Sequence, residues 1–247
     1  PLLSPFASLG RKLALDAHNV EGQMSHPIAI QFQPVDLATL GTVAGRIVLL
    51  VDEDPVTPAA RVLNRLTRGA IARANASQAG AQMKPGCALE LAFPGGLAAD
   101  AVQLVRLPRR ATVAEARKAG ASIARALTSA ATLVLAEAHP RAADVAFGLA
   151  LRTYDFTPHK TGTPVVPGTV SMAVAKPEAV AAQAGPMAAV AEGVFFTRDL
   201  VNEPANILTT HDFAARLAAM HELGLEVEIL EEDQLLRLGM GALLGVG

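Results

Sequence analysis

Short apolar runs alternate along this chain with longer stretches in which apolar residues recur at the spacing of an α-helix. The run Ile47–Val51 is continuously apolar, which is typical of a strand covered on both faces. The alternation predicts an α/β fold with a mixed or mainly parallel sheet flanked by helices. The predicted strands are Ile28–Phe32, Arg46–Asp52, Cys87–Phe93, Ala101–Leu107, Thr132–Ala136 and Thr169–Ala175.

Helical periods fill the stretches between these strands. Pro58–Asn75 is predicted as one helix, with Thr57 as its N-cap and a proline at its first position. The alanine-rich stretch Pro177–Val201 is also predicted to be helical, but bent or broken at Gly185-Pro186, because proline lacks the N–H of a helix hydrogen bond. The remaining predictions are helices at Val113–Ser129, Arg141–Tyr154, from Thr210 and at Glu231–Leu238, and a strand at Leu225–Leu230.

The order of these elements predicts two units joined by a helix. Residues 1–176 form an N-terminal α/β domain, residues 177–201 the linking helix, and residues 202–247 the beginning of a second domain. The last residues, Met240–Gly247, are apolar and carry no capping signal. We expect such a run to be buried against further elements, so the sequence reads as interrupted within its second domain.

Composition excludes several classes of protein. Hydrophobic residues make up 51% and charged residues 18% of the chain, which excludes a disordered protein. A formal net charge of −2 excludes binding of polyanions through bulk charge alone. The longest stretch without Asp, Glu, Lys or Arg, Thr161–Ala175, is shorter than the ~18 residues of a membrane span. We therefore expect no membrane partner.

Cysteine usage and the N-terminus both favour a cytoplasmic location. Cys87 is the single cysteine, so an intramolecular disulfide is excluded. Near the N-terminus, Arg11 and Lys12 follow the apolar residues, the reverse of the order in a secretory signal.

Familiar catalytic and metal motifs are not matched. The glycines of Gly239–Gly247 follow a helix and have the wrong spacing for a dinucleotide fingerprint, so a helix C-cap explains them better. His221-Glu222 lacks the second histidine of a zinc-binding helix. Ser122 lies in a helical run rather than at a strand-to-helix corner. No catalytic, metal-binding or substrate-binding residue is assigned.

Two charged groups remain as candidates for binding. Arg61, Arg65 and Arg68 share one face of the predicted helix, and Arg109 follows a strand. They are either a solvated surface or contacts to phosphate or nucleic acid, in which case the chain is a stand-alone α/β binding module. The acidic run Asp52–Asp54 ends a strand where α/β folds bind ligands, although a solvated turn explains it as well.

Two long segments carry a family resemblance. Arg198–Thr209 and Leu238–Gly247 closely resemble the cytosolic leucine aminopeptidase (leucyl aminopeptidase) family, and the upstream segments Gly69–Arg73, Ala150–Phe156 and Lys160-Thr161 agree with it. The resemblance is strong over about residues 198–247 and diffuse over the N-terminal part. It implies an N-terminal macro-domain-like sheet followed by the opening elements of a catalytic domain.

The resemblance also implies an activity. Members of this family are cytoplasmic homo-hexamers that remove N-terminal residues, preferably leucine, from peptides. They use two divalent metal ions, zinc, manganese or magnesium, which lower the pKa of a bridging water. The family's metal ligands and catalytic residues all lie downstream of the segment that Leu238–Gly247 resembles. We therefore expect this chain to be inactive alone.

Overall fold

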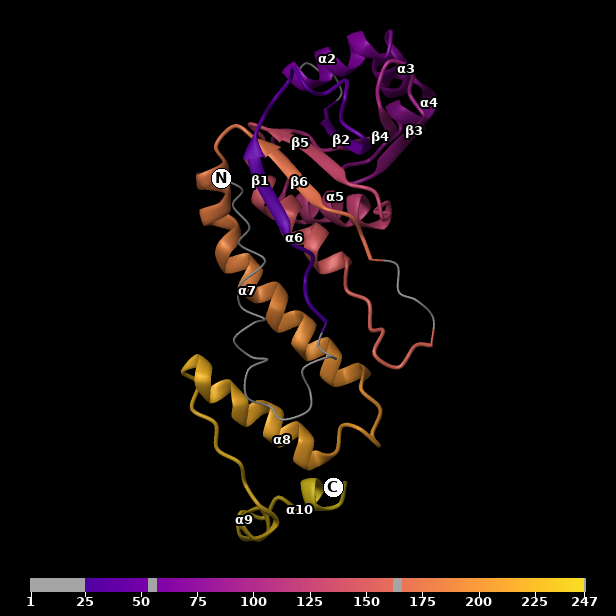
Figure 1. Cartoon of the computed structure of the whole chain (residues 1–247). Helices are drawn as coiled ribbons and strands as arrows, with labels where there is room; N and C mark the ends of the chain where they lie inside the picture. Colours follow the sequence, from indigo (N-terminus) through magenta and orange to yellow (C-terminus); the bar gives the residue numbers. More distant parts are fainter. Residues whose placement is uncertain (1–24, 53–56, 162–165, 247) are drawn as a thin grey trace.

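The computed structural model describes residues 25–52, 57–161 and 166–246. Six strands form one sheet in the order β1-β6-β5-β2-β4-β3 (Figure 1). Strand β3 runs antiparallel to β4, and the other pairs are parallel, which confirms the predicted sheet. Arg11 and Lys12 lie outside the described residues. The strands are β1 (Ile30–Pro34), β2 (Gly45–Val51), β3 (Ala88–Ala92), β4 (Ala99–Arg106), β5 (Thr132–Glu137) and β6 (Val170–Val174).

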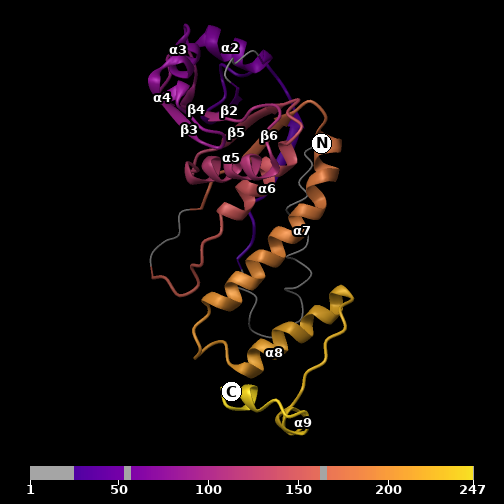
Figure 2. The ribbon, with the colours of Figure 1, turned by 180° about the vertical axis from the view of Figure 1, so that it is seen from behind.

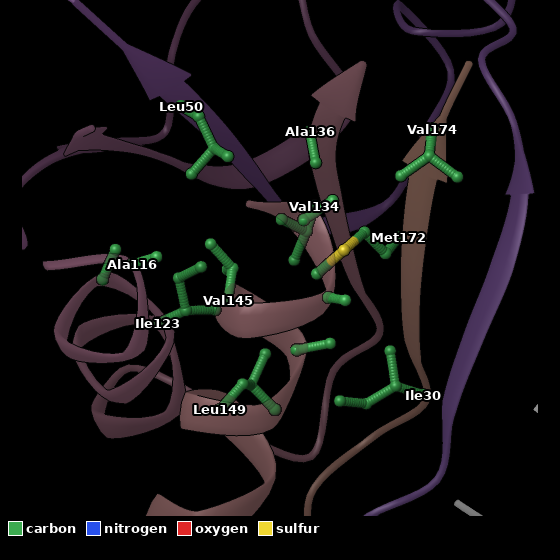
Figure 3. Packing of buried hydrophobic residues seen from close by; sticks show 14 of the residues in the cluster. Ile30, Leu50, Ala116, Ile123, Val134, Ala136, Val145, Leu149, Met172 and Val174 are labelled. Carbon is green, nitrogen blue, oxygen red and sulfur yellow. The ribbon is translucent and has the colours of Figure 1, made fainter. Parts of the chain in front are cut away.

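Helices cover both faces of the sheet, as the continuous apolar run in β2 predicts. Val48 and Leu50 point to one face, where they join a core shared with α5 and α6 (Figure 3). Ile47 and Leu49 point to the opposite face and pack against α2 and α3. The covering helices are α2 (Pro58–Leu66), α3 (Ala70–Ala76), α4 (Gln78–Ala81), α5 (Val113–Arg125) and α6 (Ala142–Arg152).

The single helix predicted over Pro58–Asn75 is wrong, because two helices occupy this stretch. Helix α2 ends at Leu66, and α3 begins at Ala70. Between them Arg68 has φ of 51° and Gly69 has φ of 83°, and this left-handed backbone is incompatible with a continuous α-helix. The Asn64 side chain accepts the N–H of Ala72, so a side chain of the first helix stabilises the second.

The predicted break at Gly185-Pro186 is also wrong, and the alternative, a bend at this point, stays a prediction. Helix α7 (Pro177–Asn202) is continuous over 26 residues and extends from the sheet toward α8 (Figures 1 and 2). The proline removes one hydrogen bond, but buried Ala184, Ala188 and Phe195 hold the helix in place on both sides of it. By length and composition alone, α7 is the one helix in the described residues that could cross a membrane. In this structure α7 packs against α6, β1 and β6.

The C-terminal part consists of short elements at the far end of α7 (Figure 1). Residues 225–230, predicted as a strand, form none, because no neighbouring strand in the described chain offers them a ladder. Leu238 is the C-cap of α9, and Gly239 follows it with φ of 71°, the left-handed conformation that commonly ends a helix, so this glycine has a capping role as predicted. The two-domain division stays a prediction. The elements are α8 (Thr210–Ala218), η2 (Ala219–Leu223), α9 (Glu232–Arg237) and α10 (Gly241–Leu244).

Candidate functional site

A pocket of about 920 Å³ opens at the carboxyl ends of the parallel strands. Its lining includes Leu50 and Asp52 from the end of β2 and Glu137 and His139 from the end of β5. These strands are neighbours, but the helices that follow them, α2 and α6, cover opposite faces of the sheet. Such a change of direction leaves a crevice between adjacent strands, which is where open α/β sheets bind ligands.

Charged side chains of both signs line this pocket. Asp52 is exposed at the end of β2, and its Oδ2 accepts the backbone N–H of Arg109 at 3.4 Å. Arg109 is also exposed and lines the same pocket. The remaining lining is mainly apolar, so the few charged groups dominate what the pocket can recognise. Glu53 and Asp54, which follow Asp52, lie outside the described residues.

Glu137 sits at an irregular point of the sheet. Its φ is 48°, a left-handed conformation uncommon outside glycine, and the register of β5 against β6 shifts between Leu135 and Glu137. The shift turns the carboxylate toward the start of α2, where Oε1 accepts the N–H of Ala59 at 3.1 Å. Glu137 therefore occupies part of the positive N-terminal end of this helix.

His139 lines the pocket as a neutral imidazole. Its Nδ1 accepts the N–H of Arg141 at 3.2 Å, so the ring proton lies on Nε2, which donates to the carbonyl oxygen of Pro108 at 3.2 Å. Burial, the largest cause, lowers the pKa of His139 below its ordinary value, and the bond to Pro108 opposes this. Both ring nitrogens are thus engaged, and the side chain ties the end of β5 to the segment after β4.

The four predicted arginine contacts do not converge. Arg61 and Arg65 are exposed on α2, whereas Arg68 lies beyond its C-terminal end in the left-handed turn. Arg109 lines the pocket together with Pro58, the first residue of α2, and Arg68 follows the other end of that helix. The expectation of one helical face with all three of Arg61, Arg65 and Arg68 is therefore wrong, and a phosphate or nucleic-acid role for the four stays a prediction.

A second group of polar side chains lies where α7 ends. Asp199 is buried; its Oδ1 accepts the hydroxyl of Tyr154 at 2.8 Å, and its Oδ2 accepts the N–H of Ser25 at 2.7 Å. The guanidinium of Arg198 lies over the Tyr154 ring, 3.8 Å from its centroid. Burial and the bond to Asp199 both raise the pKa of Tyr154, so the phenol stays protonated. Three distant segments are joined at this carboxylate.

Glu203 continues this group just beyond the helix. Its side chain is 2% exposed, with Oε2 2.8 Å from Nε2 of His159 and Oε1 3.9 Å from the guanidinium of Arg216. His159 belongs to the loop after α6, and Arg216 belongs to α8. Glu203 therefore connects the sheet domain to the first helix after α7. We call Tyr154, His159, Asp199, Glu203 and Arg216 the junction cluster.

The other motifs have structural roles. Ser122 lies in α5, as predicted, and its hydroxyl donates to the carbonyl oxygen of Gly86 at 2.6 Å. Cys87 is a partly buried free thiol. In the described residues, no group of three or more His, Cys, Asp or Glu side chains is placed to hold a metal ion.

Sequence reasoning did not single out Glu137, His139, Asp199 or Glu203. The signal for Glu137 is its position at the end of an apolar strand, next to the end of another. Glu203 lies in the segment Arg198–Thr209 that carries the family resemblance, but its partner His159 lies 44 residues earlier. Such long-range pairs leave no local pattern.

Comparison with known families places both parts of the chain in one family. The model of the N-terminal domain of the cytosol aminopeptidase family matches residues 47–163, and the model of that family's catalytic domain matches residues 195–247. Together the two models cover more than half of the chain. Most of the pocket lies in the first match, and Asp199, Glu203 and Arg216 lie in the second.

Individual proteins agree with this. A probable cytosol aminopeptidase of Cereibacter sphaeroides is 65% identical over 91% of this chain and 46% of its own length, and one of Dinoroseobacter shibae is 48% identical over the same shares. The chain thus spans about half the length of these relatives. Among solved structures, a variant of tomato leucine aminopeptidase shares the fold, with a TM-score of 0.68 at 21% identity over 94% of this chain and 49% of its own.

The bottromycin maturation enzyme BotP, solved in complex with Mn, has a TM-score of 0.54 at 28% identity over 78% of this chain and 40% of its own. The structural neighbours therefore agree with the family models. On the match of both domain models, in this order, the chain belongs to the cytosol aminopeptidase family.

Proposed function

We propose that this chain is the N-terminal part of a metal-dependent aminopeptidase that removes N-terminal residues, preferably leucine, from peptides. The observation that carries the proposal is the match of an N-terminal-domain model and a catalytic-domain model, in that order, on one chain. The names of the Cereibacter and Dinoroseobacter relatives point to the same activity.

The metal ions belong to the part of the proposed enzyme beyond these residues. The described residues do not fit a metal site, because no cluster of three potential ligand side chains occurs among them. Mn is bound by the related BotP, and we propose two divalent ions, zinc, manganese or magnesium, for the complete enzyme. The hydrolytic step is therefore not assigned to any residue described above.

The role proposed for this chain is that of a scaffold. The junction cluster connects the end of α7, the loop after α6 and the last turn of α8 through buried carboxylates. A buried carboxylate with directional partners restricts geometry more than apolar contacts of similar area do, because hydrogen bonds fix both distance and angle. The sheet domain would thereby set the position of the catalytic domain within a cytoplasmic homo-hexamer.

The test joins this chain to the part of the Cereibacter sphaeroides relative that lies beyond the matched region. Release of p-nitroaniline from L-leucine p-nitroanilide is measured with Mn²⁺ or Zn²⁺, for the chain alone and for the chimera, and the mass of each is determined in solution. We expect the chimera to be active and hexameric and the chain alone to be inactive.

Two controls make the result decisive. Removal of metal from the chimera by a chelator must abolish the activity, and returning the metal must restore it. The valine, glutamate and proline p-nitroanilides test the preference for leucine. A chimera that folds and binds metal but releases no N-terminal residue would refute the proposal, and so would hydrolysis by the chain alone.

A further inference from the structure

The pocket between β2 and β5 has the position, size and lining of a ligand site, and the proposed hydrolysis leaves it unused. We propose that it binds a short peptide or amino acid with an apolar side chain and free, charged ends. Asp52 and Glu137 would face the ammonium group, and Arg109 the carboxylate. The proposal concerns binding alone, so it does not depend on whether the complete protein hydrolyses peptides.

The apolar walls account for the side-chain preference. Val35 and Leu37 follow β1, Leu50 lies in β2, Leu107 follows β4, and Leu135 lies in β5, so apolar groups from four strands surround the space. Moving an aliphatic side chain from water into such a space is favourable by about 25 cal/mol for each Å² of apolar surface buried. A polar side chain would gain nothing here without its own hydrogen-bond partners.

The charged groups account for the free ends. Two carboxylates and one guanidinium line the same pocket, while His139 is held neutral by its two backbone contacts. A carboxylate offers about four acceptor positions, so Glu137 can accept further donors beside the N–H of Ala59, and Asp52 adds a second negative charge to the same pocket. A zwitterion supplies three ammonium donors to these carboxylates and a carboxylate that matches the fork of Arg109.

The start of α2 argues against a phosphate ligand. In α/β folds phosphate binds where the free N–H groups of a helix N-terminus point into the site. Here the N–H of Ala59 is taken by Glu137, and the N–H of Ala60 is taken by the side chain of Thr57. A phosphate would have to displace one carboxylate and approach another, Asp52. The protein's own anions thus fill the position that a nucleotide needs.

The volume accommodates a peptide of two or three residues. Small-molecule sites in proteins measure about 300–1,000 Å³, and this pocket, at about 920 Å³, lies within that range. A dipeptide also separates its charged ends, so its ammonium and carboxylate can reach groups on different strands. We therefore take L-leucyl-L-leucine as the main probe and L-leucine as the smaller one.

The first experiment compares ligands on the unaltered 247-residue chain by isothermal titration calorimetry. L-leucyl-L-leucine should bind with a Kd of about 1 mM or tighter. Its N-acetylated form and its amide each lack one charge and should bind about tenfold more weakly or worse. Inorganic phosphate, AMP and a single-stranded oligonucleotide should show no binding at the same concentrations.

The second experiment compares variants. Asp52→Asn and Arg109→Met should each weaken binding of L-leucyl-L-leucine about tenfold or more, and Arg109→Met should have little further effect on the amide, which lacks the carboxylate. Arg61→Met is the matched control, because Arg61 is exposed on α2 but does not line the pocket. Circular dichroism establishes that each variant is folded.

Three results would overturn the proposal. The first is tight binding of phosphate, AMP or the oligonucleotide that Arg109→Met abolishes, since it would make the pocket an anion site. The second is equal binding of L-leucyl-L-leucine and its N-acetylated form, and the third is unchanged binding in both pocket variants. The ligand comparison needs no variant, so it decides even where a substitution prevents folding.

Discussion

Helices α5 and α6 approach each other so closely that two glycines carry the contact. A Cβ atom added at Gly148 would lie 2.1 Å from the carbonyl oxygen of Arg117, and one added at Gly120 would lie 2.0 Å from that of Val145. Real Cβ contacts essentially never fall below 3.0 Å, so Gly148→Ala requires the helices to separate by about 1 Å. The obstacle is backbone, so no side chain can rotate away to relieve it.

Two opposing effects set the change in the free energy of unfolding that Gly148→Ala causes. Alanine stabilises the interior of a helix by about 1 kcal/mol relative to glycine. Overpacking a tight core typically costs about 1–3 kcal/mol, and a clash with backbone belongs at the upper end or above it. The balance is a loss of about 2 kcal/mol, which lowers the melting temperature of a chain of this size by roughly 4–8 °C.

The matched control is Gly193→Ala in α7. Nothing lies within 4 Å of a Cβ atom added at Gly193, so only the helix preference acts, and the melting temperature should rise by roughly 2–4 °C. Thermal and urea unfolding, followed by circular dichroism, measure both variants. A higher midpoint for Gly148→Ala, or equal shifts in the two variants, would refute the close approach of α5 and α6.

Three further predictions concern single side chains. Burial lowers the pKa of His139, so the unfolded chain binds the proton more readily than the folded chain, and stability is lost as the pH falls below about 6.5. His139→Gln should therefore reduce the pH dependence of the urea midpoint between pH 8 and pH 5. Thr112→Ala removes the capping box of α5 and should lower the thermal midpoint by about 2–4 °C, whereas an unchanged midpoint would contradict the cap. Tyr154→Phe removes the donor to Oδ1 of Asp199 and should cost about 1–2 kcal/mol in urea unfolding, with a loss below 0.5 kcal/mol speaking against the junction cluster.

The sheet could be predicted from sequence because each central strand is covered on both faces. Ile47 to Val51 are all apolar since alternate side chains enter two different cores, and few other environments produce such a run. The sequence also placed the start of α2 correctly, because Thr57 and Pro58 act through local geometry. Local rules are reliable where the cause of the structure lies within a few residues.

The predictions that failed concern features decided by contacts between residues far apart in the sequence. Residues 225–230 have strand-like composition, but a strand also needs a hydrogen-bonded neighbour, which composition does not reveal. The proline of α7 should interrupt a helix, yet tertiary packing on both sides outweighs one lost hydrogen bond. Glu137 and Asp199 acquire their roles from a register shift and from partners on distant segments, so no spacing along the chain marks them.

The helices at the two ends of the molecule differ in how far they are buried. The sheet domain buries nearly all of α6, whereas α8, η2, α9 and α10 contain no buried residue. Phe213, Leu236 and Leu243 are exposed there, although short helices gain most of their stability from burying an apolar face. These elements coincide with the match to the catalytic-domain model, and the relatives continue beyond the matched region. Under the proposed function, the rest of that domain covers this apolar surface, and the contact between Glu203 and Arg216 connects its first helix to the sheet domain.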